Sequence, residues 1–203
     1  MVQPEDGERP AILALDIGTH TGWAFYPTAG MIISGVWDLS PGRGDEALRY
    51  QRLKNALDEF WFLHNGENFE VIYEQVHRHA GTTAAHVYGG LLAFLKVWCL
   101  EHNVRLRAVG VGQIKKFWTG NGAATKEAMV AEARARGFDP VDDNEADALA
   151  LLHRRIIEGP GGEKEKPARK TRRGATKVGG RSVARRTARR LRESDGEVPE
   201  GGG

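Results

Sequence analysis

AILALDIG, residues 11–18, is the stretch that decides the fold, because five apolar residues run without a break into Asp16, Ile17 and a glycine. Such a run predicts a strand buried on both faces, and the carboxylate with the glycine predicts its end and a turn. Residues 69–73 form a second buried strand by the same reasoning, and it also ends in a carboxylate, Glu74. If the two strands are neighbours in a sheet, their acidic ends come together.

The rest of the sequence alternates between strand and helix patterns. Apolar residues recur with helical spacing in some segments, while short apolar runs bounded by Gly and Pro predict strands. The expected strands are residues 11–16, 22–25, 31–37, 69–73 and 105–109, and the expected helices are residues 46–64, 83–102, 125–137 and 142–157. Residues 110–124, which contain Gly and Lys, are expected to form a loop. We therefore predict an α/β fold with a mixed five-stranded sheet, an antiparallel meander followed by parallel strands, flanked by helices.

The helix expected at residues 83–102 is apolar around most of its circumference. That is more apolar surface than packing against one side of a sheet requires. Gly89 and Gly90 lower the helix propensity but allow another backbone to approach closely. We interpret this helix as part of the core and also as a subunit contact.

Charge is distributed unevenly along the chain. Of the net charge of +2, residues 159–203 contribute +7, from 13 Lys and Arg against 6 Asp and Glu, which leaves −5 for residues 1–158. The basic tail lacks apolar periodicity and is expected to be disordered, with residues 183–191 able to form a basic helix on nucleic acid. A solubilising extension is the alternative interpretation. With residues 1–10 as a flexible N-terminus, one globular domain is expected at residues 11–158.

The composition also excludes several classes of protein. The lone Cys99 lies in an apolar, helix-like segment, so the chain has neither a disulfide framework nor a CxxC pair for zinc or an iron cluster. The N-terminal residues lack the apolar core of a signal peptide, and no apolar run approaches the roughly 20 residues that span a bilayer. We therefore expect a soluble, cytoplasmic protein without a membrane partner.

Three carboxylates stand in apolar surroundings: Asp16 after ALAL, Glu74 after VIY, and Asp147 within NEADALALL. A carboxylate at the end of a buried strand costs free energy to desolvate unless a cation or hydrogen-bond donors compensate it. A divalent cation would relieve the mutual repulsion, and oxygen ligands without His or Cys favour Mg²⁺, or Mn²⁺, over zinc. Helical spacing puts Asn144 and Asp143 on the face of Asp147, so either is a candidate further ligand.

The acidic residues also have structural interpretations that involve no metal. An Asp before a Gly at a strand end, such as Asp16, is often only a turn residue. Asp142 and Asp143 are suited to capping a helix, and Asp142 with Glu145 resembles a capping box. Asp147 is the hardest to explain in this way, because its neighbours in the expected helix are mostly Ala and Leu.

Four segments resemble, in order and in spacing, the successive motifs of RuvC-type Holliday-junction resolvases, most closely the compact phage and bacterial members. These segments are ILALDIGTHTGWA, VIYEQVH, GVGQIKKFWTGNGAATKEAMV and DDNEADALALLHRR. The resemblance spans residues 11–155 and implies an RNase H fold, a homodimer and Mg²⁺-dependent nicking of four-way DNA junctions, with no small-molecule substrate. It also implies that Asp16, Glu74 and Asp147 are the acidic metal ligands. Lys126 falls on a basic residue that the family needs near the scissile phosphate.

The chain departs from the family's pattern at two places. Asn144 stands three residues before the last Asp, where the family usually has Asp or His, so Asn144 and Asp143 compete for the role of fourth ligand. His77, followed by Arg78, stands where the family's best-known members place an aromatic residue that wedges into the junction. Both are candidates for stacking on bases or contacting phosphate.

The resulting hypothesis is hydrolysis of a phosphodiester by a metal-activated water. Lys126 and Lys115 would steady the phosphate charge in the transition state. Lys115 and Lys116 are also candidates for contacts to the DNA backbone. Residues 153–155, His-Arg-Arg, are interpreted as cations that stabilise a helix C-terminus.

Two alternatives belong to other classes of protein. The segment DIGTHTGWA also resembles the first phosphate loop of the actin-like sugar kinases, but about 160 globular residues are too few for their duplicated domain. The second alternative is a non-catalytic or differently specific nucleic-acid-binding protein of the same fold, whose basic tail supplies the affinity. Two observations keep that alternative open. Asn144 stands where the family usually has an acid or a histidine, and the globular part of the chain has a net negative charge.

Overall fold

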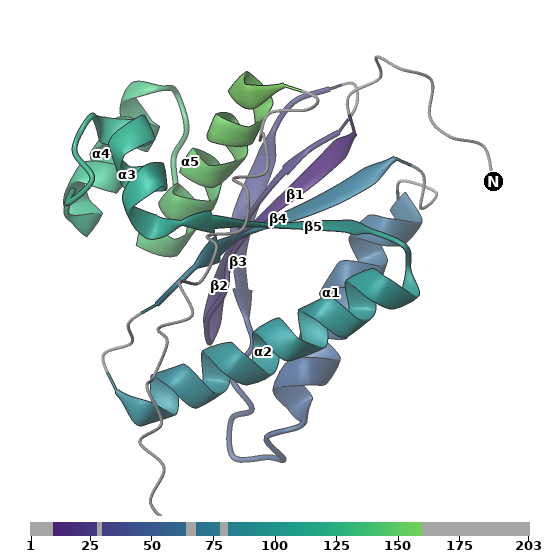
Figure 1. Ribbon diagram of the computed structural model, residues 1–203. Coiled ribbons are helices and arrows are strands. Elements are labelled where there is room, and N and C mark those ends of the chain that lie inside the picture. Colours follow the sequence, from purple (N-terminus) through teal and green to yellow (C-terminus); the bar gives the residue numbers. More distant parts are fainter. Residues whose placement is uncertain (1–9, 28–29, 64–67, 78–80, 160–203) are drawn as a thin grey trace, which may run out of the picture. The chain divides into compact units, whose positions relative to one another are not determined.

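The computed structural model describes residues 10–27, 30–63, 68–77 and 81–159. They build one five-stranded sheet with helices packed on both of its faces (Figure 1). All of these residues belong to the first of the two units, residues 1–164 and 165–203, into which the chain divides. The predicted α/β architecture is therefore confirmed.

The sheet consists of β1 (Ala11–Asp16), β2 (His20–Tyr26), β3 (Ile33–Asp38), β4 (Phe69–Gln75) and β5 (Arg105–Gly110). The order across the sheet is β3-β2-β1-β4-β5. Strands β1, β2 and β3 pair as an antiparallel meander, whereas β4 lies parallel to β1 and β5 lies parallel to β4. This is the mixed sheet that the sequence predicts, with β1 at its centre.

Successive residues of the central strand β1 face opposite sides of the sheet. Leu13 and Leu15 pack into the core on one side, whereas Ile12 and Ala14 pack into the core on the other. A strand that is covered on both faces must be apolar throughout, which explains the unbroken run AILAL. By the same alternation, Asp16 continues the row of Ile12 and Ala14.

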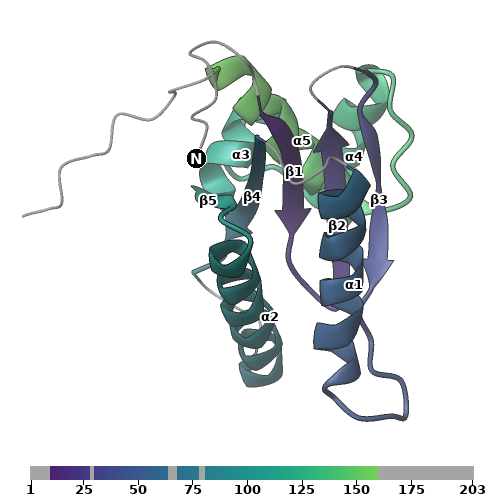
Figure 2. The same ribbon diagram turned by 90° about the vertical axis from the view of Figure 1, so that its right-hand side faces the viewer.

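Helices α1 (Leu48–Leu63) and α2 (Thr82–Glu101) cover the face to which Leu13 and Leu15 contribute (Figure 2). The two helices meet at Gly90, where an added Cβ would lie 2.3 Å from the hydroxyl oxygen of Tyr50 on α1. The glycine therefore permits a close approach, as expected. The approaching group is a side chain of α1, however, and not a second backbone.

Helix α2 is apolar on two sides. Among the described helices it is the one that is long and apolar enough to cross a membrane, judged by length and composition alone. Leu91, Leu95 and Trp98 are buried in the core under the sheet. Val97 and Leu100, in contrast, are 53% and 82% exposed. Part of the apolar surface of this helix is therefore left exposed by the residues that the structure describes.

Helices α3 (Val111–Thr119), α4 (Lys126–Ala135) and α5 (Asp143–Glu158) cover the opposite face of the sheet (Figure 2). Helix α4 begins after Thr125, whose side chain accepts a hydrogen bond from the backbone N–H of Ala128. Helix α5 buries Leu149 and Leu152, among others, against the sheet. These three helices surround the carboxyl ends of β1 and β4 from one side.

Helix α3 contradicts the prediction that residues 110–124 form a loop. Ile114 and Trp118 lie one turn apart on this helix, and both are fully buried in the second core. Two of the glycines that indicate a loop stand at the helix ends: Gly110 is its N-cap, and Gly120, with a φ of +79°, terminates it in the left-handed conformation. The prediction is wrong for two reasons. The glycines that cap the helix also indicate a loop, and the helical apolar pattern that contradicts a loop consists of only two residues.

Some predictions concern residues outside the described part of the chain. These are the flexible N-terminus over residues 1–9, the contact residue Arg78, and the basic tail over residues 160–203 with its helix-forming segment 183–191. They remain predictions, and so do the domain bounds 11–158.

Candidate metal centre

Asp16 and Glu74 lie side by side at the carboxyl ends of β1 and β4. The two strands are parallel neighbours, and their register pairs Leu15 with Tyr73, so the next residue of each strand is the acidic one. Both carboxylates belong to the face that α3, α4 and α5 cover, because side chains alternate along each strand. Two apolar runs that each end in an acid therefore meet as the sequence predicts.

A glycine in β2 allows helix α5 to bring a third carboxylate to this edge. Gly22 pairs with Asp16 across the ladder of β1 and β2. An added Cβ at Gly22 would lie 1.9 Å from the carbonyl oxygen of Asn144, so the first turn of α5 rests directly on β2. Asp147 follows about one turn later on α5. The helix thereby carries Asp147 to the point where β1 and β4 end.

The three carboxylates converge on one point. One oxygen each from Asp16, Glu74 and Asp147 lies within 4.8 Å of the other two. Within the described residues, Oδ1 of Asp147 is buried without a hydrogen-bond partner. A buried, unpartnered carboxylate oxygen beside two further carboxylates is costly unless a cation compensates it. Because all the donors are carboxylate oxygens, this acidic triad fits a hard divalent metal ion.

Burial and mutual repulsion raise the pKa of all three carboxyl groups. Desolvation, followed by the charge of Glu74, holds the pKa of Asp16 well above its ordinary value. Desolvation, followed by the charge of Asp16, raises the pKa of Asp147 to about 7. Desolvation also raises the pKa of Glu74, although its hydrogen bond with Asp16 acts in the opposite direction. In the absence of a cation, the triad therefore resists full ionisation at neutral pH.

Two lysines border the acidic triad. The charges of Lys115 on α3 and Lys126 on α4 both lower the pKa of Asp147, so both lie within electrostatic reach of it. Lys115 Nζ donates a hydrogen bond to the carbonyl oxygen of Ala124 at 3.0 Å. Lys126 Nζ pairs with Asp143 Oδ2 at 2.5 Å, and this partner raises the pKa of Lys126. Two cations thus stand on the α3 and α4 side of the triad.

The two candidate fourth ligands differ in their contacts. The side-chain amide of Asn144 donates a hydrogen bond to Asp142 Oδ2 at 2.8 Å, which ties it to the N-cap of α5. Asp143 carries a charge that raises the pKa of both Asp16 and Asp147. Its carboxylate therefore interacts with the triad, while it also pairs with a lysine.

Glu145 is a buried acid whose contacts the sequence does not reveal. Asp142 caps α5 as predicted, because its Oδ1 accepts a hydrogen bond from the backbone N–H of Glu145 at 3.0 Å. The Glu145 carboxylate makes other contacts than a capping box would: Oε2 accepts from the backbone N–H of Val141 at 2.9 Å. Oε1 accepts from the hydroxyl of Ser34 on β3 at 2.6 Å. The capping-box prediction is therefore right for Asp142 and wrong for Glu145.

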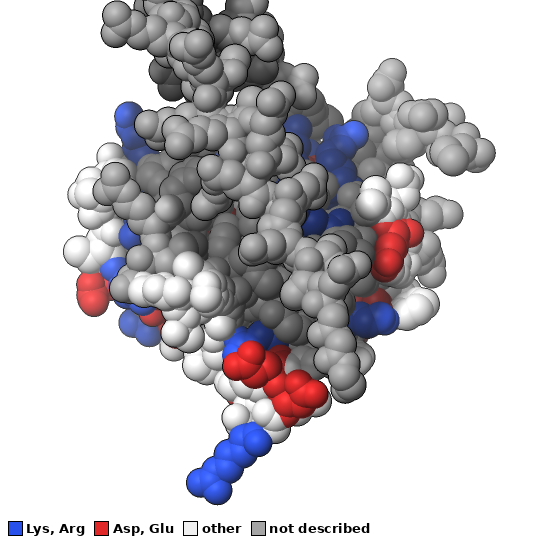
Figure 3. All heavy atoms as spheres, turned by 60° about the horizontal axis from the view of Figure 1, so that its bottom comes forward, with Lys and Arg blue, Asp and Glu red and all other residues white. Residues whose placement is uncertain are grey.

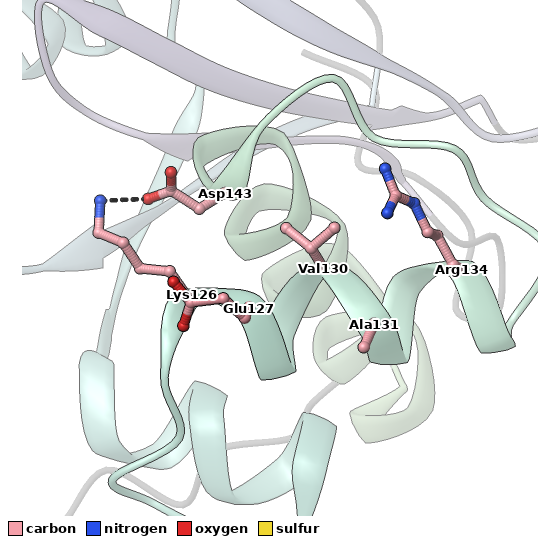
Figure 4. A pocket seen from close by; sticks show the side chains of 6 residues that line it. All are labelled: Lys126, Glu127, Val130, Ala131, Arg134 and Asp143. Atoms are coloured by element: carbon pink, nitrogen blue, oxygen red, sulfur yellow. Dashed lines mark ion pairs between the residues drawn. The ribbon is translucent and has the colours of Figure 1, made fainter.

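A pocket of about 330 Å³ opens beside the triad along α4 (Figure 4). Its lining residues are Lys126, Glu127, Val130, Ala131, Arg134 and Asp143. The ion pair of Lys126 and Asp143 stands at one end of the pocket and Arg134 at the other, with Val130 between them. The four charged side chains cancel one another. The pocket is therefore no dedicated anion site.

The remaining predicted contact residues lie at the surface. His77 is exposed, two residues beyond the end of β4, and Lys116 is exposed on α3. Gly22, which the sequence analysis did not single out, and Glu145, which it named only as part of a capping box, shape the site from within the core. A glycine inside a strand often marks a close backbone approach, so Gly22 did carry a signal in the sequence.

The fold and the acidic triad together define a mixed α/β fold with carboxylates at the ends of β1 and β4 and a third from the last helix. No protein-family model matches the chain, and no curated protein matches it either.

Two similar solved structures are both of Thermus thermophilus RuvC. The one in complex with a Holliday junction substrate has a TM-score of 0.61 and 23% identity, over 73% of this chain and 97% of that chain. The second RuvC structure has a TM-score of 0.55 and 23% identity, over 73% of this chain and 94% of that chain. At this identity the likeness shows the fold. The resemblance to RuvC that the four motifs indicate is therefore confirmed as a RuvC-like fold.

Proposed function

We propose that the protein is a metal-dependent endonuclease that cleaves phosphodiester bonds in branched DNA, with Asp16, Glu74 and Asp147 as its metal ligands. The observation that carries this proposal is the convergence of the three carboxylates, within 4.8 Å of one another, beside the unpartnered Oδ1 of Asp147. Branched DNA as the substrate is supported by the RuvC-like fold, since the similar Thermus thermophilus protein is in complex with a Holliday junction substrate.

Each group has a defined task in this reaction. Mg²⁺, when bound, would supply Lewis-acid chemistry for hydrolysis of the phosphodiester. Asp16, Glu74 and Asp147 would hold the ion at the end of the sheet. Lys126 and Lys115 place positive charge beside the phosphate, whose negative charge is redistributed in the transition state.

Asp143 is the fourth ligand that the contacts favour. Its carboxylate interacts electrostatically with Asp16 and Asp147, whereas the Asn144 amide is tied to the helix N-cap. A carboxylate also brings a full negative charge to a divalent cation, which an amide oxygen lacks. Asp143 would add its carboxylate to the three that would hold the metal, and in the structure it pairs with Lys126.

DNA would approach over the edge where these residues lie. Lys116 and His77 are exposed and available for contacts to the backbone or to bases, and Arg78 follows His77 in the sequence. A homodimer suits a junction with two strands to cut, and the exposed apolar residues Val97 and Leu100 of α2 offer a surface for it. Sedimentation at micromolar concentration checks this expectation: we expect a dimer, and a monomer would contradict it.

The proposed function is tested with a synthetic four-way junction and a linear duplex of the same sequence. In the presence of Mg²⁺ we expect the wild-type protein to nick the junction and to leave the duplex largely intact. Asp16→Asn should lower the nicking rate by about 100-fold or more, because several kcal/mol of metal-based charge stabilisation are lost. Asp139→Asn, at a residue whose side chain is 94% exposed, is the matched control and should nick like the wild type.

Two results would contradict the proposal. Equal nicking by the wild type and Asp16→Asn would show that the triad is not the catalytic site. Junction binding without nicking, in either Mg²⁺ or Mn²⁺, would instead support the alternative of a non-catalytic nucleic-acid-binding protein.

A further inference from the structure

Glu145 lies in the first turn of α5, two residues before Asp147, yet its side chain points into a different environment. Glu145 is 5% exposed. Both oxygens of its carboxylate are engaged, Oε1 by the hydroxyl of Ser34 and Oε2 by the backbone N–H of Val141. A carboxylate with both oxygens occupied in this way is not available as a metal ligand. The role of Glu145 must therefore lie in the segments that its two hydrogen bonds hold together.

The positions of Glu145 and Asp147 on the helix are complementary. Two residues correspond to about 200° of rotation about the helix axis, so the two side chains leave α5 on nearly opposite sides. Glu145 reaches β3 through Ser34 at one edge of the sheet. Asp147 reaches the ends of β1 and β4, on the other side of β2 from β3. A rotation of α5 about its axis would therefore move both contacts together.

Gly22 and Glu145 restrain different motions of α5. The contact between Gly22 and the carbonyl oxygen of Asn144 sets how closely the helix rests on β2. A van der Waals contact of this kind has no preferred direction, so it does not fix the rotation of α5 about its own axis. The hydrogen bond of Glu145 to Ser34 is directional and acts off the helix axis, so it does fix the rotation. The bond to Val141 joins the same carboxylate to the segment that leads into the helix.

We propose that Glu145 and Ser34 form a clamp that sets the rotation of α5 and thereby holds Asp147 within reach of Asp16 and Glu74. Glu145 is thus a positioning residue for the metal centre and not a ligand. The inference rests on the proposed function, because it assigns the clamp a role in metal binding. Groups behind the ligands of metal sites commonly act in this way, and their loss typically weakens metal binding by about 10- to 100-fold.

The chemistry of the clamp gives a discriminating pair of variants. In Glu145→Gln, the amide oxygen can accept from Val141 N–H while the amide nitrogen donates to the Ser34 hydroxyl, which both donates and accepts. The clamp then survives without its charge. In Glu145→Ala both hydrogen bonds are lost. A role that depended on the negative charge of Glu145 would make the two variants equally defective, whereas a clamp makes only the Ala variant defective.

The test measures Mn²⁺ affinity of the full-length protein by isothermal titration calorimetry, independently of nicking. We expect Glu145→Ala to bind Mn²⁺ about 10-fold more weakly than the wild type. We expect Ser34→Ala to weaken binding in the same direction and Glu145→Gln to stay close to the wild type. Ser40→Ala is the matched control, because the Ser40 hydroxyl bonds to Asp38 and not to α5.

If Glu145→Ala folds poorly, Ser34→Ala alone carries the test, since it removes the one hydrogen bond from the half-buried Ser34 on β3 and leaves the acid in place. Wild-type affinity in Ser34→Ala would then overturn the clamp. Equal losses in Glu145→Gln and Glu145→Ala would also overturn it, in favour of a charge effect. If the wild-type protein itself binds no Mn²⁺, the proposed metal centre fails first, and the clamp's role in metal binding falls with it.

Discussion

Glu70 and Glu74 lie four residues apart on β4 and face the same side of the sheet, yet their side chains have neighbours of opposite charge. Glu70 is matched by two arginines: its Oε2 is 2.7 Å from Arg155 Nη2 and its Oε1 is 3.1 Å from Arg107 Nε. Among the described residues no ion pair reaches Glu74, which instead meets the acidic Asp16. Glu70 therefore stabilises the fold through its ion pairs, whereas the buried charge of Glu74 has no such compensation among the described residues and would be stabilised by a bound cation.

This contrast predicts opposite effects of the same substitution. Glu70→Gln should lower the free energy of unfolding by about 3–5 kcal/mol, because it leaves buried arginine charge without its partner. Glu74→Gln should raise it by on the order of 1 kcal/mol in metal-free buffer, because it removes repulsion within the acidic triad. Urea denaturation with EDTA at pH 7.5 measures both. A loss of stability in Glu74→Gln similar to that in Glu70→Gln would mean that Glu74 serves the fold.

The raised pKa of Asp147 predicts how stability depends on pH. Its folded pKa of about 7 lies above its ordinary value of 3.8, so the folded state binds more protons than the unfolded state between these values. The free energy of unfolding of the metal-free protein should therefore fall as pH rises from about 4 to about 7, by on the order of 2 kcal/mol after allowing for partial exposure.

The pH dependence is checked by urea denaturation at pH 5 and pH 8. In Asp147→Asn the decrease in stability should be smaller than in the wild type, while the exposed control Asp139→Asn should keep the full decrease. A wild-type protein that gains stability from pH 5 to pH 8 would contradict the raised pKa of the triad.

At the scale of elements, the approach of α5 to β2 is the contact on which the site depends most. Gly22→Ala would place a Cβ 1.9 Å from the carbonyl oxygen of Asn144, a backbone atom with no room to move without shifting the helix. We expect a loss of about 1–3 kcal/mol in the free energy of unfolding, as for other overpacked sites, together with weaker Mn²⁺ binding.

Gly89→Ala is the control for this substitution. Apart from the chain neighbours and the nearby backbone of its own helix, no described atom lies within 4 Å of a Cβ added there, and the residue lies within α2. Alanine should stabilise that helix by up to about 1 kcal/mol. If Gly22→Ala were as harmless as Gly89→Ala in denaturation, the close packing of α5 on β2 would be refuted.

The elements also show how far the sequence alone could lead. The strands are predictable because a strand buried on both faces needs an unbroken apolar run, as AILAL provides. Helix α3 is not predictable in this way, because only Ile114 and Trp118 indicate its buried side and the surrounding glycines indicate a loop. The meeting of Asp16 and Glu74 follows from strand order. The contact of Glu145 with Ser34 does not follow from the sequence, because it joins residues 111 positions apart in the chain.

The sequence interpretation of Arg155 illustrates the same limit. A cation near a helix C-terminus is expected to stabilise the helix dipole, and Arg155 does donate a hydrogen bond to the carbonyl oxygen of Gly159. Its pairing with Glu70, however, is buried and joins α5 to β4. Only the three-dimensional packing reveals that this arginine fixes the end of α5 away from the acidic triad.

At the scale of the whole molecule, the proposed function requires a chain with an acidic globular part to bind DNA, which is a polyanion. On the face shown in Figure 3, Lys and Arg side chains of the described residues are interspersed with Asp and Glu instead of forming one basic surface. Residues 159–203 carry +7, against −5 for the rest of the chain. We therefore expect the tail to supply much of the non-specific affinity for DNA.

Deletion of residues 164–192, which contain all 13 Lys and Arg of the tail, tests this expectation. The truncated protein should bind a four-way junction more weakly at low salt, and its affinity should depend less steeply on salt concentration, because fewer counterions are released. Fluorescence anisotropy at several salt concentrations measures both. The Mn²⁺ affinity of the domain should not change. An identical salt dependence in both proteins would assign the DNA contacts to the domain instead.

The central claim is that Asp16, Glu74 and Asp147 converge in order to bind a metal ion. Anomalous diffraction from crystals of the full-length protein soaked in Mn²⁺ tests this most directly. We expect a peak bonded to an oxygen of each of the three carboxylates, with Asp143 and not Asn144 as the further protein ligand. A Mn²⁺ peak elsewhere, or none at the triad at saturating concentration, would contradict the claim and leave the three carboxylates without a metal-binding role.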